Sequence, residues 1–327
     1  MGKKHILISG GAGFIGSNLC AHFLSEGYQV RCFDNLATGR KRNIESLVEN
    51  PSFEFIEGDI RNFEDCANAV KGIDAVLHQA ALGSVPRSID DPITTNAVNT
   101  AGFLNMLEAS RKQGIKRFVY AASSSTYGDH PALPKLEDNI GKPLSPYAVT
   151  KYINELYAKV YFDLFGMELI GLRYFNVFGP NQDPNGAYAA AIPKFIQAFI
   201  NHTSPSIHGD GEQTRDFTYI DNVVQINALA LESENPEAYG EVFNVAYGNR
   251  SSINEVVNKI RALLANYDKE ISNIDMNYAA PRQGDVRHSL ASIEKAQSIL
   301  NYKPKYDALQ GLERAIDWYW KDLKIDN

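Results

Sequence analysis

The chain has 327 residues, of which 44% are hydrophobic and 22% are charged, and it contains 17 Tyr and 16 Phe. Its length corresponds to about two domains of roughly 150 residues each, and its aromatic content excludes an intrinsically disordered chain. The formal net charge of −7 argues against a nucleic-acid partner or an anionic membrane surface. These values are typical of a folded, soluble protein with a substantial core.

The cysteines, the N-terminal stretch and the histidines bear on where the protein works. The 3 cysteines form no Cys-x-x-Cys pair, and free thiols are typical of a reducing compartment. Two lysines and a long uncharged stretch near the N-terminus resemble an export signal, but glycines and polar residues interrupt that stretch. The 7 histidines show no metal-ligand spacing. We therefore expect a cytoplasmic protein with no metal site and no membrane segment.

The first half of the chain alternates short apolar runs with amphipathic stretches. The runs that we expect to be buried strands are His5–Ser9, Tyr28–Phe33, Phe53–Glu57, Ile73–Leu77, Arg117–Ala122 and Glu168–Arg173. The stretches that we expect to be helices are Ile15–Glu26, Thr95–Gln113 and Pro146–Phe165. This alternation predicts parallel strands joined by right-handed crossovers, and hence a doubly wound α/β sheet.

The pattern becomes mixed after Asn176. We expect a turn-rich loop at 181–186, a helix at Ala187–Ile200 and a short strand with a tight turn in Ser204–Arg215. A further strand at Glu241–Ala246 is a candidate to rejoin the main sheet. Two last helices are expected, one capped by Ser252 and running to about Asn266, the other capped by Asp307 and running to about Leu323. We therefore expect a first domain at 1–176, to which about 217–246 also belongs, and a smaller lobe made mainly of 177–327.

Three glycines follow the first expected strand directly, at Gly10, Gly13 and Gly16. At this spacing, glycine lets the backbone turn sharply, approach a pyrophosphate closely and pack the next helix onto the sheet. Phe14 and Ile15 stand at the start of that helix, whose unpaired N–H groups favour phosphate binding. The motif therefore predicts a dinucleotide site.

Asp34 ends the second expected strand. An acid at this place accepts hydrogen bonds from the adenosine ribose and repels a 2′-phosphate, so it selects NAD over NADP. Nearby cations, at Arg31 and from Arg40 to Arg42, favour the opposite choice, but such a run is more often a solvated loop. We expect NAD. The other residues that we expect around it are Asn35, Gly39, Asp59, Ile60, Gln79, Ala80 and Ala81.

Tyr147 and Lys151 stand one helical turn apart after Ser145 and Pro146, which suit a helix N-cap and first position. A lysine ammonium and an oxidised nicotinamide near a phenol favour the phenolate, so Tyr147 is a candidate general base. Ser123 closes the fifth expected strand, at whose carboxyl end ligands bind in such sheets. A Tyr-x-x-x-Lys pattern alone is usually a helix surface, but beside the glycine motif and the serines it indicates catalysis.

With these residues in place, the chain resembles the extended short-chain dehydrogenase/reductase family, in its nucleotide-sugar-modifying branch, and within it UDP-N-acetylglucosamine 4-epimerases. The likeness runs from Gly10 to about Tyr306. The matching stretches are Leu82–Ser88, Ala122–Asp129, Ser145–Lys151, Arg173–Gly179, Gly209–Phe217 and Gly284–Ser289. The resemblance implies a Rossmann-type domain with a smaller C-terminal α/β substrate lobe.

The resemblance also implies roles for individual residues. Tyr147 would be the base on the sugar 4-hydroxyl, Lys151 would support it and anchor the nicotinamide ribose, and Ser123 would hydrogen-bond the reacting oxygen. Asn99 matches a position near the cofactor. The residues implied at the UDP-sugar are Ser84, Ser123, Ser124, Ser125, Tyr147, Asn176, Arg215, Arg282 and Asp285. A homodimer is implied as well, with the helices Thr95–Gln113 and Pro146–Phe165 in a four-helix bundle.

Members of this family first oxidise C4 of the sugar with NAD and then diverge. Dehydratases and decarboxylases carry acidic residues just after the catalytic hydroxyl, where this chain has Ser124 and Ser125. Elimination is therefore disfavoured, and we expect a 4-keto sugar that takes the hydride back on its other face. The resemblance points to UDP-N-acetylglucosamine and UDP-N-acetylgalactosamine, with UDP-glucose and UDP-galactose as a further pair.

Several alternatives stay open. Gly83, Ser84 and Ser289 leave room for a 2-acetamido group, although small residues are also common in tight turns. Arg87 and Arg287 keep a UDP-glucuronate-type 4-epimerase open, because a hexuronate needs a cation near C6. A non-catalytic NAD(H)-binding sensor of the same fold has no need of the three catalytic candidates. For Arg215, the structural alternative is a salt bridge to Asp216 or Asp221.

Overall fold

The computed structural model describes residues 4–184, 190–281 and 287–325. Seven strands, all paired in parallel, form the central sheet in the order β11-β6-β5-β4-β1-β2-β3. Their bounds are β1 His5–Ser9, β2 Gln29–Asp34, β3 Phe53–Glu57, β4 Ala75–His78, β5 Arg117–Ser123, β6 Glu168–Tyr174 and β11 Glu241–Val245. The order reverses between β1 and β4, so the expected Rossmann-type doubly wound sheet is confirmed.

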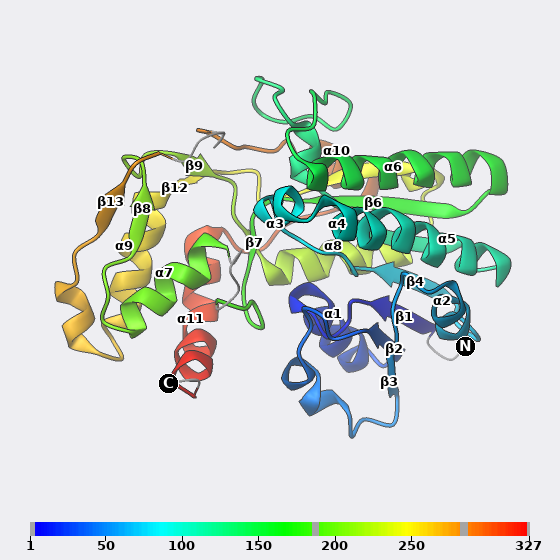
Figure 1. Ribbon diagram of the computed structural model, residues 1–327, viewed down its shortest axis with the longest axis horizontal. Helices are drawn as coiled ribbons and strands as arrows, with labels where there is room; N and C mark the ends of the chain where they lie inside the picture. The colour runs from blue at the N-terminus through cyan, green and yellow to red at the C-terminus, as the bar shows by residue number, and fades with distance from the viewer. Residues whose placement is uncertain (1–3, 185–189, 282–286, 326–327) are drawn as a thin grey trace.

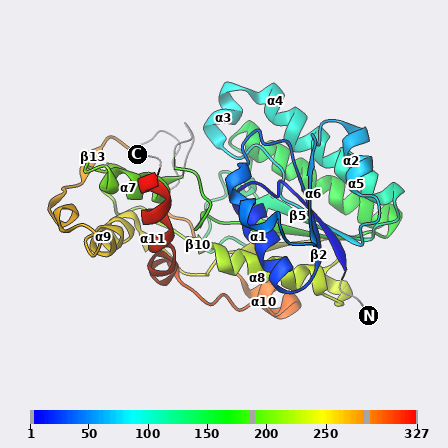
Figure 2. The same cartoon turned by 90° about the horizontal axis from the view of Figure 1, so that it is seen from below.

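Helices cover both faces of this sheet (Figures 1 and 2). On one face lie α2 Phe63–Ala69, α3 Val85–Asp90, α4 Pro92–Asn96, α5 Phe103–Lys112 and α6 Pro146–Phe165; on the other lie α1 Phe14–Ser25, α8 Ile220–Glu232 and α10 Glu294–Leu300. Two hydrophobic clusters separate the faces: Leu7 packs with the α5 side, whereas Ile6 and Ile8 pack with the α1 and α8 side. This is the period-two alternation of a strand that is buried on both faces.

Local signals placed most of these elements. The bounds of β1, β3 and α6 coincide with those expected, and the other predicted sheet strands shift by one or two residues at an end. The helix expected at Thr95–Gln113 is a helical run that begins earlier, with a π-helical turn at Ala97–Gly102 between α4 and α5. The pattern analysis did not predict α8, which packs against α1 and the sheet.

The smaller part of the molecule lies beside the carboxyl ends of the sheet strands (Figure 1). It contains α7 Ala191–Ile200, α9 Ile253–Leu264 and α11 Ala308–Ile325, with the short pairs β8 Ser206–His208 with β13 Asn277–Ala279, β9 Thr214–Arg215 with β12 Ser251–Ser252, and β7 Val177–Phe178 with β10 Thr218–Tyr219. Short 3₁₀ turns complete the chain at Lys41–Asn43, Glu45–Leu47, Ser124–Tyr127, Pro236–Ala238 and Lys269–Asn273.

Two expectations for this half are refined and two are confirmed. The single strand expected in Ser204–Arg215 is two strands, β8 and β9, separated by the turn. The helix expected from Ala187 begins at Ala191, and 187–189 lie outside the described residues. The strand expected at Glu241–Ala246 does rejoin the main sheet, as β11 beside β6. Ser252 caps α9 as expected, with a capping box to Glu255.

No helix within 4–184, 190–281 and 287–325 is both long enough and apolar enough to cross a membrane.

Candidate active site

The glycine turn between β1 and α1 is built as the motif predicts. Gly10 has φ +69° and its N–H donates to Phe33 O at 2.8 Å, which ties the turn to β2. A Cβ at Gly10 would lie 2.7 Å from the Ala80 backbone nitrogen, and a Cβ at Gly16 would lie 2.1 Å from Gly10 O. Only glycine fits both places, so the turn and the start of α1 sit directly against the ends of β2 and β4.

A cavity of about 340 Å³ opens above this turn. Eleven of the cofactor candidates line it: Gly10, Gly13, Phe14, Ile15, Gly16, Asp34, Asn35, Ile60, Gln79, Ala80 and Ala81. It is also lined by Gly83, which was expected beside the sugar, and by residues with no expected role at the cofactor: Phe33, Ala37, Thr38, Gly58, Arg61, Leu82, Thr94 and Val98. Most of these extend the strand ends already recognised, whereas Thr94 and Val98 reach the cavity through folding of α4 and the π-helical turn.

The Asp34 carboxylate lies at the end of β2 beside the cavity. It accepts the N–H groups of Ala12 at 3.0 Å and Leu36 at 2.8 Å. Burial raises the pKa of this carboxyl, and the backbone N–H groups oppose the rise. Gly39 does not line the cavity, but a Cβ there would lie 2.9 Å from both Asp34 oxygens, so its lack of a side chain leaves room for the carboxylate.

Two further cofactor candidates act through residues that line the cavity. Asp59 accepts hydrogen bonds from Asn35 at 2.9 Å and from the Arg61 guanidinium, which lowers the pKa of this carboxyl to about 2. Asn99, in the π-helical turn, clamps both backbone groups of Leu82 and donates to Thr150 Oγ1 at 3.3 Å. A glycine turn, a helix N-terminus and an acid at the end of β2 together fit a dinucleotide.

The cations that left NADP open are all engaged with carboxylates. The ion pairs are Arg31–Glu54 at 2.7 Å, Arg40–Asp183, Lys41–Glu57 at 3.6 Å and Arg42–Asp322 at 3.2 Å. Each positive charge is therefore offset by a neighbouring acid instead of being left to bind a 2′-phosphate, which agrees with the choice of NAD.

The Tyr147 phenol lies in the first turn of α6. Ser145 caps this helix, its hydroxyl accepting the Ala148 N–H at 3.1 Å, with Pro146 in the first position. Burial raises the pKa of Tyr147, and a hydrogen bond with Ser123 lowers it in part. Ser123 Oγ lies 2.8 Å from Ser125 Oγ. The Ser123 hydroxyl therefore lies near enough to the Tyr147 phenol to affect its pKa.

Lys151 is buried one turn further along α6. Its ammonium donates to Ala121 O at 2.8 Å, and burial lowers its pKa to about 8, against the opposing charge of Glu155. We expected this ammonium to lower the pKa of the Tyr147 phenol toward neutral pH, but burial of the phenol within the chain has the opposite effect. Desolvation of the phenol outweighs the favourable contacts, so its pKa stands above the ordinary value.

Sheet order explains where these hydroxyls sit. Ser123 ends β5 and stands opposite Tyr174, the last residue of β6. On the other side of β5 lies β4, whose continuation from Gln79 lines the dinucleotide cavity. The continuation of β6 leads to Asn176, which lines a second cavity of about 390 Å³. Ser123 therefore stands on the strand between those that lead into the two cavities.

The second cavity brings together Asn176 and Arg215, as expected. Asn176 donates to Asp216 O at 3.0 Å, and Arg215 donates to Thr214 O at 3.0 Å. The two acids of the salt-bridge alternative for Arg215 have other partners. Asp216 accepts backbone N–H groups, and Asp221 pairs with Arg314 at 3.5 Å. The other lining residues are Val177, Phe178, Ala190, Ala191, Ile192, Lys194, Phe195, Ser206, His208, Gln213, Phe217 and Ile253.

The remaining substrate candidates are placed as follows. Ser84 has φ +134° and caps α3, accepting the Arg87 N–H at 3.2 Å. Ser124 and Ser125 form the 3₁₀ turn that follows β5. Arg282 and Asp285 lie outside the described residues.

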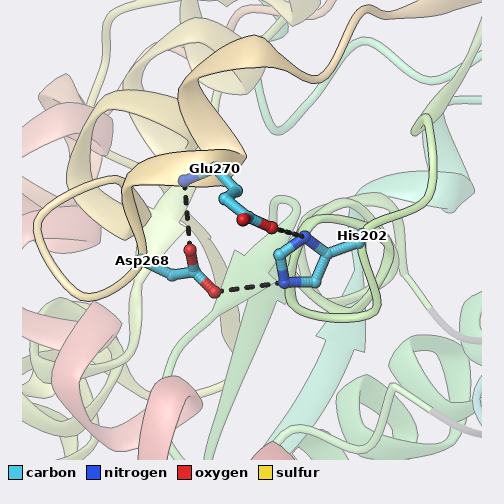
Figure 3. Close-up of side chains that lie close together, drawn as sticks. All are labelled: His202, Asp268 and Glu270. Carbon is cyan, nitrogen blue, oxygen red and sulfur yellow. Dashed lines mark hydrogen bonds and ion pairs between the residues drawn. The ribbon is translucent and has the colours of Figure 1, made fainter.

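Figure 3 shows a cluster with metal-ligand chemistry, away from both cavities' linings. His202 lies 3.1 Å from Asp268 and 3.8 Å from Glu270. Asp268 also accepts the Glu270 N–H at 3.0 Å. These contacts tie the end of α7 to the turn after α9, which is a structural role that needs no ion.

Comparison with known proteins gives concordant results. The sequence profile of the NAD dependent epimerase/dehydratase family matches residues 6–246. A UDP-glucose 4-epimerase from Mycolicibacterium smegmatis is 32% identical over 96% of this chain and 97% of that protein. The solved structure of the UDP-N-acetylglucosamine 4-epimerase from Methanobrevibacter ruminantium M1 in complex with UDP-N-acetylmuramic acid is 37% identical, with a TM-score of 0.90 over 98% of this chain and 100% of that one. The solved structure of the UDP-glucuronic acid 4-epimerase from Bacillus cereus in complex with UDP-glucuronic acid and NAD is 33% identical, with a TM-score of 0.87 over 98% of this chain and 99% of that one.

Proposed function

The chain belongs to the NAD-dependent epimerase/dehydratase family, and from this premise we propose that it is a UDP-sugar 4-epimerase whose main substrates are UDP-N-acetylglucosamine and UDP-N-acetylgalactosamine, with UDP-glucose and UDP-galactose as a second pair. One observation carries the proposal. The Ser123 hydroxyl lowers the pKa of the Tyr147 phenol, and Ser123 ends the strand that lies between the two strands leading into a dinucleotide cavity and a cavity containing Arg215.

The chemistry divides between the cofactor and the chain. The Gly10–Gly16 turn and Asp34 would hold NAD, which when bound as NAD⁺ would supply the hydride acceptor for C4 of the sugar and, once reduced, the hydride donor. Tyr147 takes the proton of the 4-hydroxyl and gives it back, while Ser123 holds the reacting oxygen. The pKa of Lys151 is about 8, so its ammonium is mostly charged at pH 7. That positive charge favours the Tyr147 phenolate and so opposes the burial that raises the pKa of Tyr147.

The absence of an acid beside Ser123 supports epimerisation over elimination. The two residues after Ser123 are serines, and a hydroxyl is a poor proton donor for a leaving group near neutral pH. The next step that remains for a 4-keto sugar is therefore return of the hydride. Rotation of the sugar before that return inverts the configuration at C4.

The choice of the acetylated sugar has one support: the chain is similar over its length to a UDP-N-acetylglucosamine 4-epimerase. Gly83, a candidate for leaving room for the 2-acetamido group, lines the dinucleotide cavity. Of the cations considered for a UDP-hexuronate, Arg287 pairs with Asp210 at 3.1 Å at the surface. UDP-glucuronate stays in the test panel because the chain is also similar to the Bacillus cereus enzyme.

The test is proton NMR of the anomeric region after the purified protein is mixed with UDP-N-acetylglucosamine, UDP-glucose or UDP-glucuronate, with no nicotinamide added. We expect signals of the 4-epimer to grow to a steady ratio with UDP-N-acetylglucosamine, more slowly with UDP-glucose, and not with UDP-glucuronate. Faster turnover of UDP-glucuronate would overturn the substrate choice but not the reaction.

Replacement of Tyr147 by Phe separates an enzyme from a sensor of the same fold. Because the phenol is the proposed base, Tyr147→Phe loses turnover by about a hundredfold or more while it binds NAD as the wild type does. Retained turnover in this variant would remove Tyr147 from the reaction. Turnover absent from both proteins, with NAD bound, would favour the sensor.

We also propose that residues 177–327 bind mainly the nucleotide sugar, and that the chain forms a homodimer through a four-helix bundle. Val149, Leu156, Val160 and Leu164 are exposed along one face of α6, a stripe that a partner helix would cover. Further exposed apolar side chains lie at Ile89 and Ile93, on the α3 and α4 helices that pack beside α6.

Light scattering after size exclusion tests the dimer. We expect the wild type at twice its 36.3 kDa mass and Leu164→Lys nearer to the monomer, because a charge within an apolar interface is costly. Val48→Lys makes the same change at an exposed site elsewhere and leaves the mass unchanged. A wild-type monomer would exclude the bundle.

A further inference from the structure

Three side chains form a closed ring of hydrogen bonds at the wall of the dinucleotide cavity. Gln79 directly follows β4 and lines this cavity. Its Nε2 donates to Asn227 Oδ1 at 3.2 Å, and its Oε1 accepts the Tyr174 hydroxyl at 3.1 Å. Asn227 closes the ring by donating from Nδ2 to the Tyr174 oxygen at 3.0 Å. Because Tyr174 ends β6 and Asn227 lies in α8, the ring joins the cavity wall to a strand and to a helix.

The donors and acceptors of this ring fit together in one arrangement. Asn227 also donates from Nδ2 to Val223 O at 2.8 Å. Since a carbonyl oxygen only accepts, the amide nitrogen of Asn227 must face Val223, which leaves the Asn227 oxygen for Gln79. Gln79 must then offer that oxygen its N–H and turn its own oxygen toward Tyr174. The backbone of α8 therefore sets the orientation of the Gln79 amide.

Tyr174 is a donor to Gln79 over the whole physiological pH range. Burial raises the pKa of its phenol to about 12, so the hydroxyl keeps its proton near pH 7. The phenol also lies 3.3 Å from Asn227 Oδ1, but that oxygen already accepts the Gln79 N–H. The shorter contact with Gln79 Oε1 is thus the one that completes the ring.

The ring uses half of the hydrogen-bonding capacity of Gln79. An amide side chain has two N–H donors and two oxygen lone pairs, and the ring takes one of each. Within 4–184, 190–281 and 287–325, the Gln79 side chain makes no other hydrogen bond. The residue is half-buried and lines the cavity. One donor and one acceptor, held in a fixed orientation, therefore remain for a ligand.

The sheet order indicates which part of the ligand Gln79 meets. β4 lies between β1, which leads into the glycine turn, and β5, which ends at Ser123. The glycine turn suits the pyrophosphate, and the reacting hydroxyls require the nicotinamide. The polar stretch between the two, with its phosphate oxygens and ribose hydroxyls, is therefore the part that passes the end of β4.

We propose that Tyr174 and Asn227 are positioning residues that hold the Gln79 amide for hydrogen bonding to this stretch of NAD. A fixed amide loses less conformational entropy on binding than a free one, so the ring strengthens cofactor binding without touching the cofactor. The proposal concerns the cofactor site and does not depend on which sugar is epimerised, or on whether one is.

The alternative is a ring that only fastens α8 to the sheet. The two roles differ in what they predict for the cofactor. A purely structural ring affects the stability of the fold and leaves cofactor release unchanged. A positioning ring affects cofactor release, and it does so only while the Gln79 amide is present.

Release of NADH from the wild type and from ring variants distinguishes the two roles. Excess NAD is added to the NADH-loaded protein, and the loss of the fluorescence of bound NADH gives the dissociation rate. We expect Tyr174→Phe and Gln79→Leu each to raise this rate severalfold, and the double variant to match Gln79→Leu. Tyr302→Phe is the matched control: it removes the buried hydrogen bond from Tyr302 to Ala246 O, at 3.0 Å, and lines neither cavity. Its rate should equal that of the wild type.

Asn227→Ala tests the other arm of the ring. We expect it to speed NADH release in the wild-type background and to have no further effect in Gln79→Leu. Release at the wild-type rate from Gln79→Leu, or from both Tyr174→Phe and Asn227→Ala, would overturn the proposal. It would also be overturned if the two ring variants speed release equally with and without Gln79, or if Tyr302→Phe speeds release as much as they do. No sugar turnover enters these rates, so failure of the proposed reaction would leave the result intact.

Discussion

His78 illustrates how burial decides the state of a single residue. It ends β4, is fully buried, and its Nδ1 lies 2.7 Å from Ser9 Oγ. Burial, with a smaller contribution from the charge of Lys151, lowers the pKa of its imidazole to about 3. The ring is therefore neutral near pH 7 and serves as a hydrogen-bonded support beneath the glycine turn.

This makes His78 a source of acid instability. Between about pH 3 and pH 6.5 the unfolded chain binds a proton at this ring that the folded chain does not, so the free energy of unfolding falls as the pH drops through that window. The loss is about 2 kcal/mol between pH 6.5 and pH 5. Urea titrations at both pH values should show a smaller difference for His78→Asn than for the wild type. An equal difference in the two proteins would mean that the ring is not neutral in the folded state.

Gly16 is the residue of the glycine turn at which substitution is tolerated least. Because a Cβ would stand 2.1 Å from Gly10 O, Gly16→Ala must displace the turn or the helix from the sheet. We expect NAD binding to be lost, measured by the absorbance and fluorescence of cofactor retained after gel filtration. Gly72→Ala is the control, because a Cβ there meets nothing within 4 Å and costs only the strain of a positive φ, about 1–2 kcal/mol. Full NAD retention by Gly16→Ala would contradict the packing argument.

At the level of elements, a buried ion pair joins the catalytic helix to the sheet. Arg173 on β6 donates to both oxygens of Glu155 on α6, at 2.9 and 2.7 Å, and to Glu137 O at 2.8 Å. Both side chains are about 5% exposed. Glu155 also opposes the loss of charge at Lys151, one turn earlier. The pair thus holds the helix that carries Tyr147 in register with the strand beside Ser123.

Removal of one partner should be far more costly than removal of a surface pair on the same helix. Glu155→Ala leaves Arg173 charged and buried, which costs about 3–5 kcal/mol. Asp163→Ala breaks the Lys159–Asp163 pair, in which both side chains are about half exposed, and costs less than about 1 kcal/mol. Urea unfolding followed by circular dichroism measures both. Similar losses in the two variants would show that the buried pair is not specially coupled.

Across the whole molecule, the two parts are joined over the phosphate end of the dinucleotide cavity. Asn18 donates to Pro180 O and Asn181 donates to Ser17 Oγ, both at 2.9 Å, and Arg40 pairs with Asp183. Of these residues, Arg40, Asn181 and Asp183 line a small cavity that shares Gly13, Phe14 and Thr38 with the dinucleotide cavity. We call these three contacts the bridge. A cofactor bound on the glycine turn would have to pass the bridge when it dissociates.

Loss of the bridge should therefore speed release of NAD. We expect Asp183→Asn to raise the dissociation rate severalfold, because it removes the ion pair with Arg40; displacement of bound NADH, followed by its fluorescence, measures the rate. Glu57→Gln is the matched control, since the Lys41–Glu57 pair involves the same loop but does not cross between the two parts. Equal rates in the wild type and Asp183→Asn would place the exit elsewhere.

The sequence alone determined the features that depend on neighbours in the chain. The strand and helix alternation, the glycine turn, the Ser145–Pro146 helix start and the Tyr147–Lys151 spacing are local, because period, capping and backbone freedom act over a few residues. The doubly wound parallel sheet, and the expectation that ligands sit at its carboxyl edge, followed from that alternation. These features were sufficient to place eleven of the cofactor candidates around one cavity.

Tertiary structure alone decided what depends on burial and on distant partners. Arg40 and Arg42 find their acids 143 and 280 residues away, so a pattern of cations could not reveal that their charges are offset. The rise in the pKa of Tyr147 likewise comes from packing. Desolvation and charge pairing are set by neighbours in space, and for these residues the neighbours come from remote parts of the chain.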